Sequence, residues 1–340
     1  MGKIKARIIE DKSEWEKFIL GSGPKSFLQS WDWGDVQSNL GNEIFRYGFY
    51  ENNKLIGVSQ YIGQNAKRGR HLIVPGGPII DWSNTILVER WISTSKDISK
   101  KGGYWFFRIR PELLDNAQNR TKLEKLGFVS SPMHLHSENT WILNIRSGEE
   151  EIMSGMRKNT RYMVRKAIKS DLKAETTIDF DKVDILYDLQ KKTAKRHGFV
   201  GFSKDLFKAQ IEIFGRDDLA KLYLIKKEKE VLVAAIIIFY GDYAYYHHSA
   251  SSEKSRDYPA SYLLQWQVIK DAKKRGLSYY NFWGIAPKGR ADHRFSGVTT
   301  FKKGFGGKRI DWLHAMDYPV DSRYWLTNTF EKIRKKIRNL

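Results

Sequence analysis

The stretch FRYGFYENNKLIGVSQYI, residues 45–62, sets a pattern that the rest of the chain repeats. It holds two segments rich in aromatic and aliphatic side chains, 45–50 and 55–62, separated by the polar turn Glu51-Asn52-Asn53-Lys54. The same arrangement returns later, where segment 221–225 and the long apolar run 231–240 flank a charged turn at 226–230. Each pair of segments is a predicted strand–turn–strand unit.

A second element follows each of these units. The sequences Lys100-Lys101-Gly102 and Lys273-Lys274-Arg275-Gly276 are typical of helix ends, and each precedes an aromatic strand, at 104–109 and 279–283. Two copies of one α/β unit, offset by about 177 positions, account for this order. We therefore predict an α/β protein with two tandem domains.

Composition narrows the possible functions. The 340 residues carry 59 basic and 39 acidic side chains, a formal charge of +20, which suggests a polyanionic partner. Because the chain has no cysteine, a disulfide scaffold, a Cys-ligated zinc site and a Cys nucleophile are excluded. The longest apolar run, 231–240, is too short to cross a bilayer, and the N-terminal segment lacks the apolar core of a secretion signal. We expect a cytoplasmic protein that acts as a monomer.

Between the two copies, residues 148–171 have helical periodicity. One side carries cations every four residues, which we call the cationic ridge: Arg157, Arg161, Arg165, Lys169 and Lys173. Such a run is either an ordinary solvated face or a surface for phosphates. Because five like charges repel one another, a phosphate partner would relieve their repulsion.

The C-terminal segment 325–340 is also helical in period. Its apolar residues are Leu326, Phe330, Ile333, Ile337 and Leu340, and Lys and Arg occupy most of the other positions. A basic amphipathic helix of this kind could contact an anionic membrane. The commoner arrangement, which we expect here, is packing of the apolar side on its own domain.

Several kinds of chemistry lack support. His134 and His136 would share one side of a strand and His247 and His248 would face opposite sides, so neither pair has the spacing of a zinc protease and we expect no metal. Neither a Gly-x-Ser-x-Gly elbow nor a phosphate-binding P-loop is present.

Each copy suggests an N-acetyltransferase-like (GNAT) unit. At the position of the coenzyme A pyrophosphate loop, however, the second copy has Tyr258-Pro259, and Pro259 has no N–H to donate. We expect a different acyl donor and no cofactor.

Several segments together resemble the Fem peptidyltransferases. They are FLQSWDW (27–33), RKNTRY (157–162), RHG (196–198), YP (258–259), LQW (264–266), YNFWGI (280–285) and GVTTFKKGFGG (297–307). The resemblance covers nearly the whole chain, and the segments FKKGFG and YP…LQW are its most specific parts.

The resemblance implies two tandem GNAT-like domains that move an amino acid from aminoacyl-tRNA to a peptidoglycan precursor. The acceptor would be the stem peptide of UDP-MurNAc-pentapeptide or lipid II, and the amino acid would be Gly, Ala or Ser. The chain has no room for the coiled-coil arm of some relatives and is similar to the compact FemX-like type. Predicted domains are 1–147 and 148–320, with the catalytic segment at 297–307 and a basic helix at 321–340.

The resemblance also implies the site residues. Lys302 and Phe301 would be the catalytic pair, with the Lys302 ammonium stabilising the oxyanion that forms during aminolysis; a general base is not evident. Arg196 matches the position that grips the nucleotide diphosphate. Gln37 replaces a lysine of UDP-using relatives, which leaves lipid II open. The other predicted acceptor contacts are Trp33, Trp105, Tyr246, His248 and Tyr258. Arg157, Arg161, Arg165 and Lys169 are the predicted tRNA contacts.

Three other functions stay open. The chain could be a non-catalytic binder of RNA or anionic membrane on a GNAT-like scaffold. It could transfer an amino acid to a protein N-terminus, as leucyl/phenylalanyl-tRNA–protein transferase does. It could also be an N-acyltransferase that still uses coenzyme A, although Pro259 argues against that.

Overall fold

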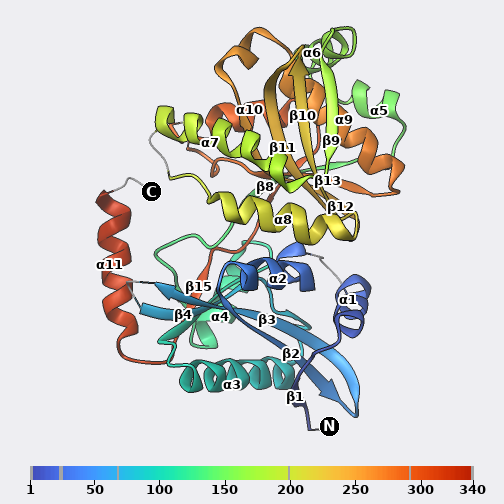
Figure 1. Cartoon of the computed structure of the whole chain (residues 1–340). Coiled ribbons are helices and arrows are strands. Elements are labelled where there is room, and N and C mark those ends of the chain that lie inside the picture. Colours follow the sequence, from blue (N-terminus) through green and yellow to red (C-terminus); the bar gives the residue numbers. More distant parts are fainter. Residues whose placement is uncertain (1–2, 23–25, 67–68, 198–199, 291, 338–340) are drawn as a thin grey trace. The chain divides into compact units, whose positions relative to one another are not determined.

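The computed structural model describes residues 3–22, 26–66, 69–197, 200–290 and 292–337. The chain forms two compact units (Figure 1). Unit 1 comprises Met1–Glu138 and Asp311–Leu340, and unit 2 comprises Asn139–Ile310. Each unit is built on one mixed β-sheet.

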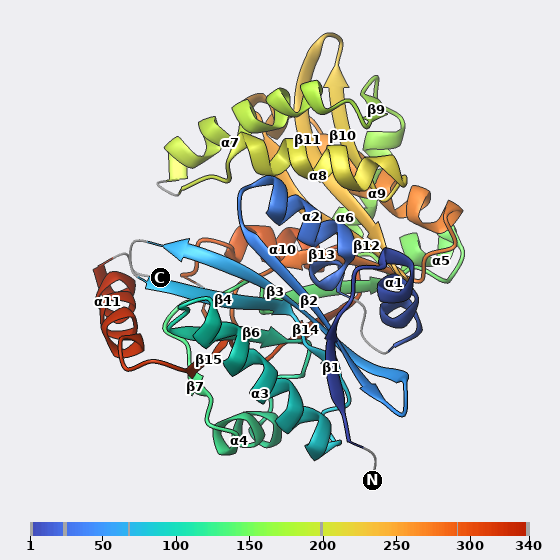
Figure 2. The same ribbon diagram turned by 60° about the horizontal axis from the view of Figure 1, so that its bottom comes forward.

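The sheet of unit 1 has the strand order β1-β2-β3-β4-β6-β15-β7, with β5 paired to β3. Helices α1 and α2 pack on one face of this sheet and α3 on the other (Figure 2). The strands are β1 (Lys5–Ile8), β2 (Glu43–Glu51), β3 (Lys54–Ala66), β4 (Gly69–Gly76), β5 (Ile79–Ile80), β6 (Phe106–Pro111), β7 (Val129–Ser130) and β15 (Met316–Pro319). The helices are α1 (Lys12–Gly21), α2 (Trp31–Asn39), α3 (Thr85–Lys101), α4 (Ala117–Lys125) and α11 (Tyr324–Ile337).

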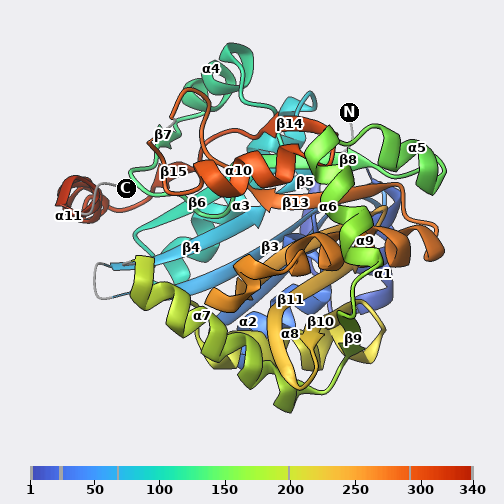
Figure 3. The same cartoon turned by 90° about the horizontal axis from the view of Figure 1, so that it is seen from above.

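The sheet of unit 2 has the order β14-β8-β13-β12-β11-β10-β9, with α7 and α8 on one face and α9 on the other (Figure 3). The strands are β8 (Asn139–Asn144), β9 (Lys173–Thr177), β10 (Ala220–Lys227), β11 (Glu230–Tyr240), β12 (Tyr243–Ser251), β13 (Tyr279–Gly284) and β14 (Lys308–Asp311). The helices are α5 (Glu149–Ser154), α6 (Lys158–Ile168), α7 (Val183–His197), α8 (Lys204–Arg216), α9 (Ala260–Lys274) and α10 (Ser296–Lys303).

Helices on both faces explain why β11 reads as an unbroken apolar run. Val233, Ala235 and Ile237 belong to the core cluster on the α9 side, and Ile236 and Ile238, also fully buried, point to the other face. A strand covered on both sides loses the alternation of apolar and polar residues that marks a half-exposed strand.

The internal repeat is real. In both units, four antiparallel strands lead to a parallel pair, β4 with β6 and β12 with β13. Corresponding strands β2 and β10, β3 and β11, β4 and β12, and β6 and β13 start 173 to 177 residues apart. The predicted hairpins and aromatic strands are confirmed.

In each sheet, the strand that completes the pairing beside the parallel pair comes from a part of the chain outside that unit's repeat. The strand beside β6 in unit 1 is β15, which follows unit 2 in the sequence. The strand beside β13 in unit 2 is β8, which directly follows the first repeat. The unit boundary therefore lies at 138/139 and the chain returns to unit 1 at 311. The predicted boundaries, 147/148 and 320/321, differ because hydrophobic patterns do not show which sheet a strand joins.

Residues 148–171 form two helices, not one. The helical path stops at Gly155, and α6 starts after Met156, which is buried, and Arg157, whose N–H donates to the carbonyl of Gly304 at 2.9 Å. Lys173 lies in β9 and so leaves the cationic ridge. The predicted strand around His134 and His136 is also absent, since residues 131–138 have no regular structure.

Glycines allow the segment after α10 to lie close to β8. Gly307 has φ +85°, and a Cβ there would meet the carbonyl oxygen of Ile142 at 2.4 Å.

We predict that Gly307→Ala lowers the free energy of unfolding by about 1–3 kcal/mol, because both the backbone conformation and the contact resist a side chain. The control is Gly297→Ala in α10, where a Cβ meets nothing within 4 Å. Urea unfolding should show Gly297→Ala as neutral or stabilising; equal stability of both variants would contradict the argument.

Candidate active site

The ammonium of Lys302 is buried in unit 2. Its side chain comes from the last turn of α10, is 5% exposed, and donates a hydrogen bond from Nζ to the carbonyl oxygen of Gly284 at 2.6 Å. Burial lowers the pKa of Lys302 to about 7, because a charged group is costly away from water. At neutral pH this side chain can therefore both donate and accept a proton.

Lys302 lies where two parallel strands part. Strands β12 and β13 pair over only three positions, ending at Tyr245 with Asn281. Beyond that point, Trp283 adopts φ +63°, an unusual conformation for a residue with a large side chain, and the register between β13 and β8 shifts. The next carbonyl, that of Gly284, accepts from Lys302. Figures 2 and 3 show α10 alongside β13. The strained turn thus aims a backbone acceptor at the lysine.

The FKKGFGG segment (301–307) holds α10 in place. A Cβ on Gly304 would lie 2.1 Å from the hydroxyl of Thr160, so glycine lets the end of α10 contact α6. Phe305 is fully buried in the core of unit 2, and Trp141 donates from its indole N–H to the carbonyl of Gly306 at 2.6 Å. At the other end of α10, the Thr299 hydroxyl accepts from the N–H of Ala286. These contacts explain why glycine at 304 and phenylalanine at 305 suit the FKKGFGG segment, which is part of the resemblance to the Fem peptidyltransferases.

One aromatic ring lies beside the Lys302 ammonium, and other aromatic side chains pack against the same core cluster of unit 2. The Tyr246 ring centroid lies 5.8 Å from Nζ of Lys302, and burial raises the pKa of Tyr246. Phe301 packs edge-on against Tyr262, with centroids 5.1 Å apart. Tyr258 is partly buried against the same core. Of the predicted site residues, Lys302 and Tyr246 therefore lie together, and Phe301 and Tyr258 pack on the same core cluster.

His248 faces the other side of the sheet. A β-bulge between Ile236 and Ile237 leaves His247 as the extra residue, so Tyr246 and His248 point to opposite faces. His248 is 5% exposed, its Nε2 lies 3.2 Å from the amide nitrogen of Gln210 in α8, and burial lowers its pKa to about 3. His247 also bonds Gln210, with Nδ1 3.1 Å from Oε1. The expectation that the two histidines face opposite sides is wrong because of the bulge.

The remaining predicted acceptor contacts divide between the units. Trp33 and Gln37 lie on α2 of unit 1; Trp33 is 4% exposed and packs edge-on against Phe27, and Gln37 accepts from Asn42. Trp105, also in unit 1, is half-buried beneath the guanidinium of Arg323. Arg196 belongs to the last turn of α7, but its side chain lies outside the described residues.

The cationic ridge is partly structural. The guanidinium of Arg161 donates to the carbonyl of Ser154 at 2.8 Å and so caps the end of α5. Arg157, Arg165 and Lys169 are exposed. Arg157 precedes the first turn of α6, where no acidic residue balances its charge. Cations at a helix N-terminus are unfavourable for the helix dipole, so this end of α6 is suited to an anion.

Unit 1 also contains a histidine–carboxylate cluster that sequence spacing does not reveal, because one of its members is distant along the chain from the other two. His134, Glu138 and His314 place potential metal-ligand atoms within 4.8 Å of one another. Hydrogen bonds account for the cluster: Nδ1 of His314 bonds Glu138 at 2.9 Å and Nε2 bonds the carbonyl of Ser131 at 2.7 Å. Burial alone would raise the pKa of Glu138, but the bonds from both histidines outweigh it and lower that pKa to about 2. The cluster joins residue 314 to the loop at 131–138.

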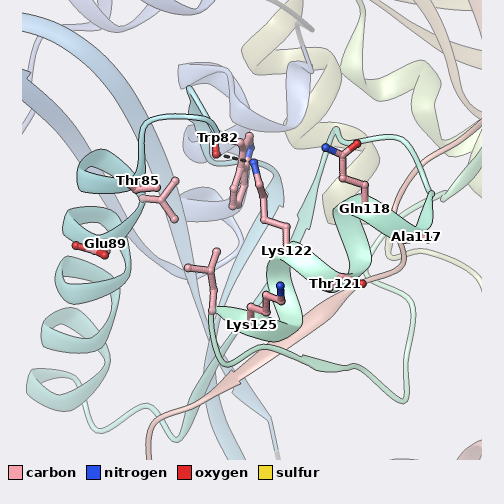
Figure 4. Close-up of a pocket in the computed structure, with 10 residues that line it drawn as sticks. Trp82, Thr85, Glu89, Ala117, Gln118, Thr121, Lys122 and Lys125 are labelled. Carbon is pink, nitrogen blue, oxygen red and sulfur yellow. Dashed lines mark hydrogen bonds between the residues drawn. The ribbon is translucent and has the colours of Figure 1, made fainter.

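A cavity of about 650 Å³ opens between α3 and α4 of unit 1 (Figure 4). Its lining includes Trp82, Val88 and Leu126, and the ammonium of Lys122 is held by the carbonyl of Trp82 at 2.8 Å. It offers no buried ammonium or histidine, so the chemistry available in unit 2 is missing from its lining.

Comparison with known proteins gives the family. The model of the FemAB family matches residues 11–226 and 217–332. The chain belongs to the FemAB family. It is 21% identical to a lipid II:glycine glycyltransferase of Staphylococcus epidermidis over 394 residues, covering 95% of this chain and 94% of the relative. The corresponding Staphylococcus aureus protein is 20% identical, covering 96% and 97%. This FemAB protein is accordingly an aminoacyltransferase.

Solved structures confirm the expected fold. FemX superposes with a TM-score of 0.83 at 19% identity, covering 96% of this chain and all of FemX. A tandem GNAT protein from the clavulanic acid pathway superposes with a TM-score of 0.59 at 11% identity, covering 93% and 98%. The FemAB chain thus has two tandem GNAT-like domains, and the described residues contain no coiled-coil arm.

Burial of Lys302 should cost stability. Because its folded-state pKa lies below the ordinary value of 10.5, the unfolded chain binds more protons and stability rises with pH from about 7 towards 10. We predict that Lys302→Met stabilises the protein at pH 6–7 and loses about 3 kcal/mol of that advantage by pH 9.5. Urea unfolding across this range measures it, with Lys17→Met at an exposed site as the control for lost charge. A pH-independent difference would show that the buried ammonium is not destabilising.

Proposed function

We propose that this FemAB protein transfers an amino acid from aminoacyl-tRNA to the amino group of a peptidoglycan stem peptide. The observation that carries the proposal is the buried Lys302 with its pKa near 7, held at the parting of β12 and β13 in a FemAB family chain. Relatives named for glycyl transfer to lipid II support glycine as the amino acid and a lipid-linked acceptor. Alanine and serine, and the soluble UDP-linked acceptor, are the alternatives that the assay must compare.

The reaction is aminolysis of an ester. The neutral acceptor amine attacks the ester carbonyl of the aminoacyl-tRNA, and a C–N bond forms as the carbonyl oxygen becomes an oxyanion. The ammonium of Lys302 stabilises this charge in a site with little water, where electrostatic interactions are strong. The C–O bond to the ribose then breaks. Lys302 gives a proton to the departing ribose oxygen and recovers one from the former amine.

This role removes the need for a separate general base. A lysine with an ordinary pKa would hold its proton too tightly to exchange it at neutral pH, whereas the pKa of Lys302 is near 7. The Gly284 carbonyl orients Nζ without adding a charge that would raise this pKa. Tyr246 lies beside the ammonium, and Phe301, the next residue along α10, packs on the core of unit 2; the 5% exposure of Lys302 limits water at the site.

The acceptor would be held by residues outside the lysine site. Arg196 keeps its proposed role with the diphosphate, and Gln37, Trp105 and Tyr258 remain proposed contacts because each is at least partly accessible. Trp33 and His248 are nearly fully buried among other side chains, so we assign them a role in packing.

The cationic ridge is proposed to bind the tRNA backbone. Its exposed members, Arg157, Arg165 and Lys169, lie on the same unit as Lys302. The start of α6 is joined to the end of α10 by the bond from Arg157 N–H to the Gly304 carbonyl. Phosphates bound along α6 would therefore place the aminoacyl end within reach of the catalytic helix.

Lys302 variants test the mechanism. We predict that Lys302→Ala lowers kcat by about 10²–10³ with little change in acceptor affinity, because the lost interaction is strong only in the transition state. The measurement combines the protein, tRNAs charged with Gly, Ala or Ser, and lipid II or UDP-MurNAc-pentapeptide, with mass spectrometry of the acceptor. Normal transfer by Lys302→Ala would remove the catalytic assignment.

The pH profile tests the same residue in a second way. We predict that kcat of the wild type falls as pH rises through about 7, since the Lys302 ammonium is lost. Lys302→Arg should be only partly active, but this descending limb should be absent because a guanidinium stays protonated. If the limb is the same in Lys302→Arg, another group causes it.

The cationic ridge is tested by salt dependence. We predict that Arg165→Ala with Lys169→Ala weakens tRNA binding and flattens the log–log salt slope by up to about 1.8, or about 0.9 for each lost phosphate contact. Arg161 is excluded from the design because it caps α5. The control, Lys17→Ala with Lys54→Ala, removes the same charge from exposed sites of unit 1. If both pairs have equal effects, general charge rather than the ridge binds tRNA.

A further inference from the structure

Helix α11 turns its apolar side outward. Leu326, Phe330, Ile333 and Ile337 recur at intervals of three or four and form one stripe, and their side chains are 68%, 53%, 54% and 79% exposed. Trp325, beside the stripe, is 54% exposed. Figure 1 shows α11 at the margin of unit 1, beside the end of β15. The expectation that this side packs on its own domain is wrong.

The side of α11 that is buried against unit 1 is the polar side. The guanidinium of Arg108 on β6 binds Asp317 on β15 with two bonds, at 2.6 and 2.9 Å, and Glu331 on α11 at 2.7 Å. Both carboxylate side chains are fully buried. Tyr324 donates to Asp317, and Asn328 donates to Tyr324. A buried ionic group is tolerated only with its partners in place, so this network fixes the rotation of α11 about its axis.

Cations border the exposed stripe. Lys332 and Lys336 are exposed and Arg334 is half-buried, whereas Lys335, also half-buried, lies on the opposite side of α11, where its charge acts on His314. The only acidic residue of α11 is Glu331, which faces Arg108. The outer surface of the helix therefore combines aliphatic and aromatic side chains with positive charge and carries no negative charge.

We propose that α11 is an interfacial anchor that lays its apolar stripe on an anionic lipid bilayer. At 14 residues it lies along the membrane surface, since no helix in the described part of the chain is long and apolar enough to cross one. An apolar stripe with Lys and Arg beside it and Trp at the margin is the composition that partitions into the headgroup region of anionic membranes. The proposal goes beyond aminoacyl transfer and would stand without it.

Other occupants fit the surface less well. A second copy of the chain, related by two-fold symmetry, would bring two sets of Lys332, Arg334 and Lys336 together. Nucleic acid would satisfy the cations but leave the apolar stripe in water. Only an anionic lipid surface matches both the stripe and the charge.

Vesicle flotation with the full-length protein tests the anchor. Vesicles contain phosphatidylglycerol and phosphatidylcholine at about 3:7, or phosphatidylcholine alone, at low and at 0.5 M salt. We expect the wild type to bind the anionic vesicles at least tenfold more tightly than the neutral ones. Leu326→Ser with Ile333→Ser, which keeps every charge, should reduce binding to anionic vesicles at least tenfold.

Matched controls separate the anchor from general adsorption of a protein with charge +20. Ile8→Ser with Leu114→Ser removes two equally exposed apolar side chains elsewhere on unit 1 and should bind like the wild type. Lys332→Gln with Lys336→Gln should lose the preference for anionic lipid. Melting temperatures establish that each variant is folded.

Three results would overturn the proposal. The first is a folded wild type that does not bind anionic vesicles at low salt. The second is unchanged binding of Leu326→Ser with Ile333→Ser, which would assign all binding to charge. The third is dimerisation in sedimentation experiments that the same variant abolishes while vesicle binding is absent, which would make a second copy the occupant.

Discussion

The candidate active site depends on the parting of β12 and β13. While two parallel strands pair, their backbone groups are occupied by each other; where they separate, those groups become available. Here the freed acceptor is the Gly284 carbonyl, and the group that uses it is the Lys302 ammonium. Among the described residues, the Gly284 carbonyl accepts from this lysine, and burial lowers its pKa, so its proton is held weakly.

Much of the surrounding structure serves this arrangement. The left-handed conformation of Trp283 and the buried lysine both cost free energy, and the well-packed core of unit 2 offsets that cost. Gly304 and Gly307 let α10 and the segment after it contact α6 and β8. Most residues of the FKKGFGG segment therefore have a structural role. Within it, Lys302 has the buried ammonium with a lowered pKa.

Residue patterns predicted the repeat, its hairpins and the aromatic strands, because periodicity and turn residues are local properties. They could not predict that β8 and β15 join the sheet of the other repeat, since partner choice depends on long-range packing. The bulge at His247 likewise reversed the side on which His248 lies. The resemblance to the Fem peptidyltransferases points to Lys302, but the burial and the lowered pKa of this lysine follow only from its three-dimensional surroundings. Nothing in the pattern of α11 shows that Glu331, and not the apolar stripe, faces the protein.

The exchange of strands also has a consequence for biosynthesis. During translation, residues 1–138 leave the ribosome long before β15, so the edge of β6 stays unpaired until residues 316–319 emerge. Unit 2, by contrast, is contiguous and can complete its sheet first. An exposed edge strand invites wrong pairing, so premature termination after unit 2 would leave an aggregation-prone product. For the same reason, gene fragments cut at the visible repeat boundary would encode neither domain intact.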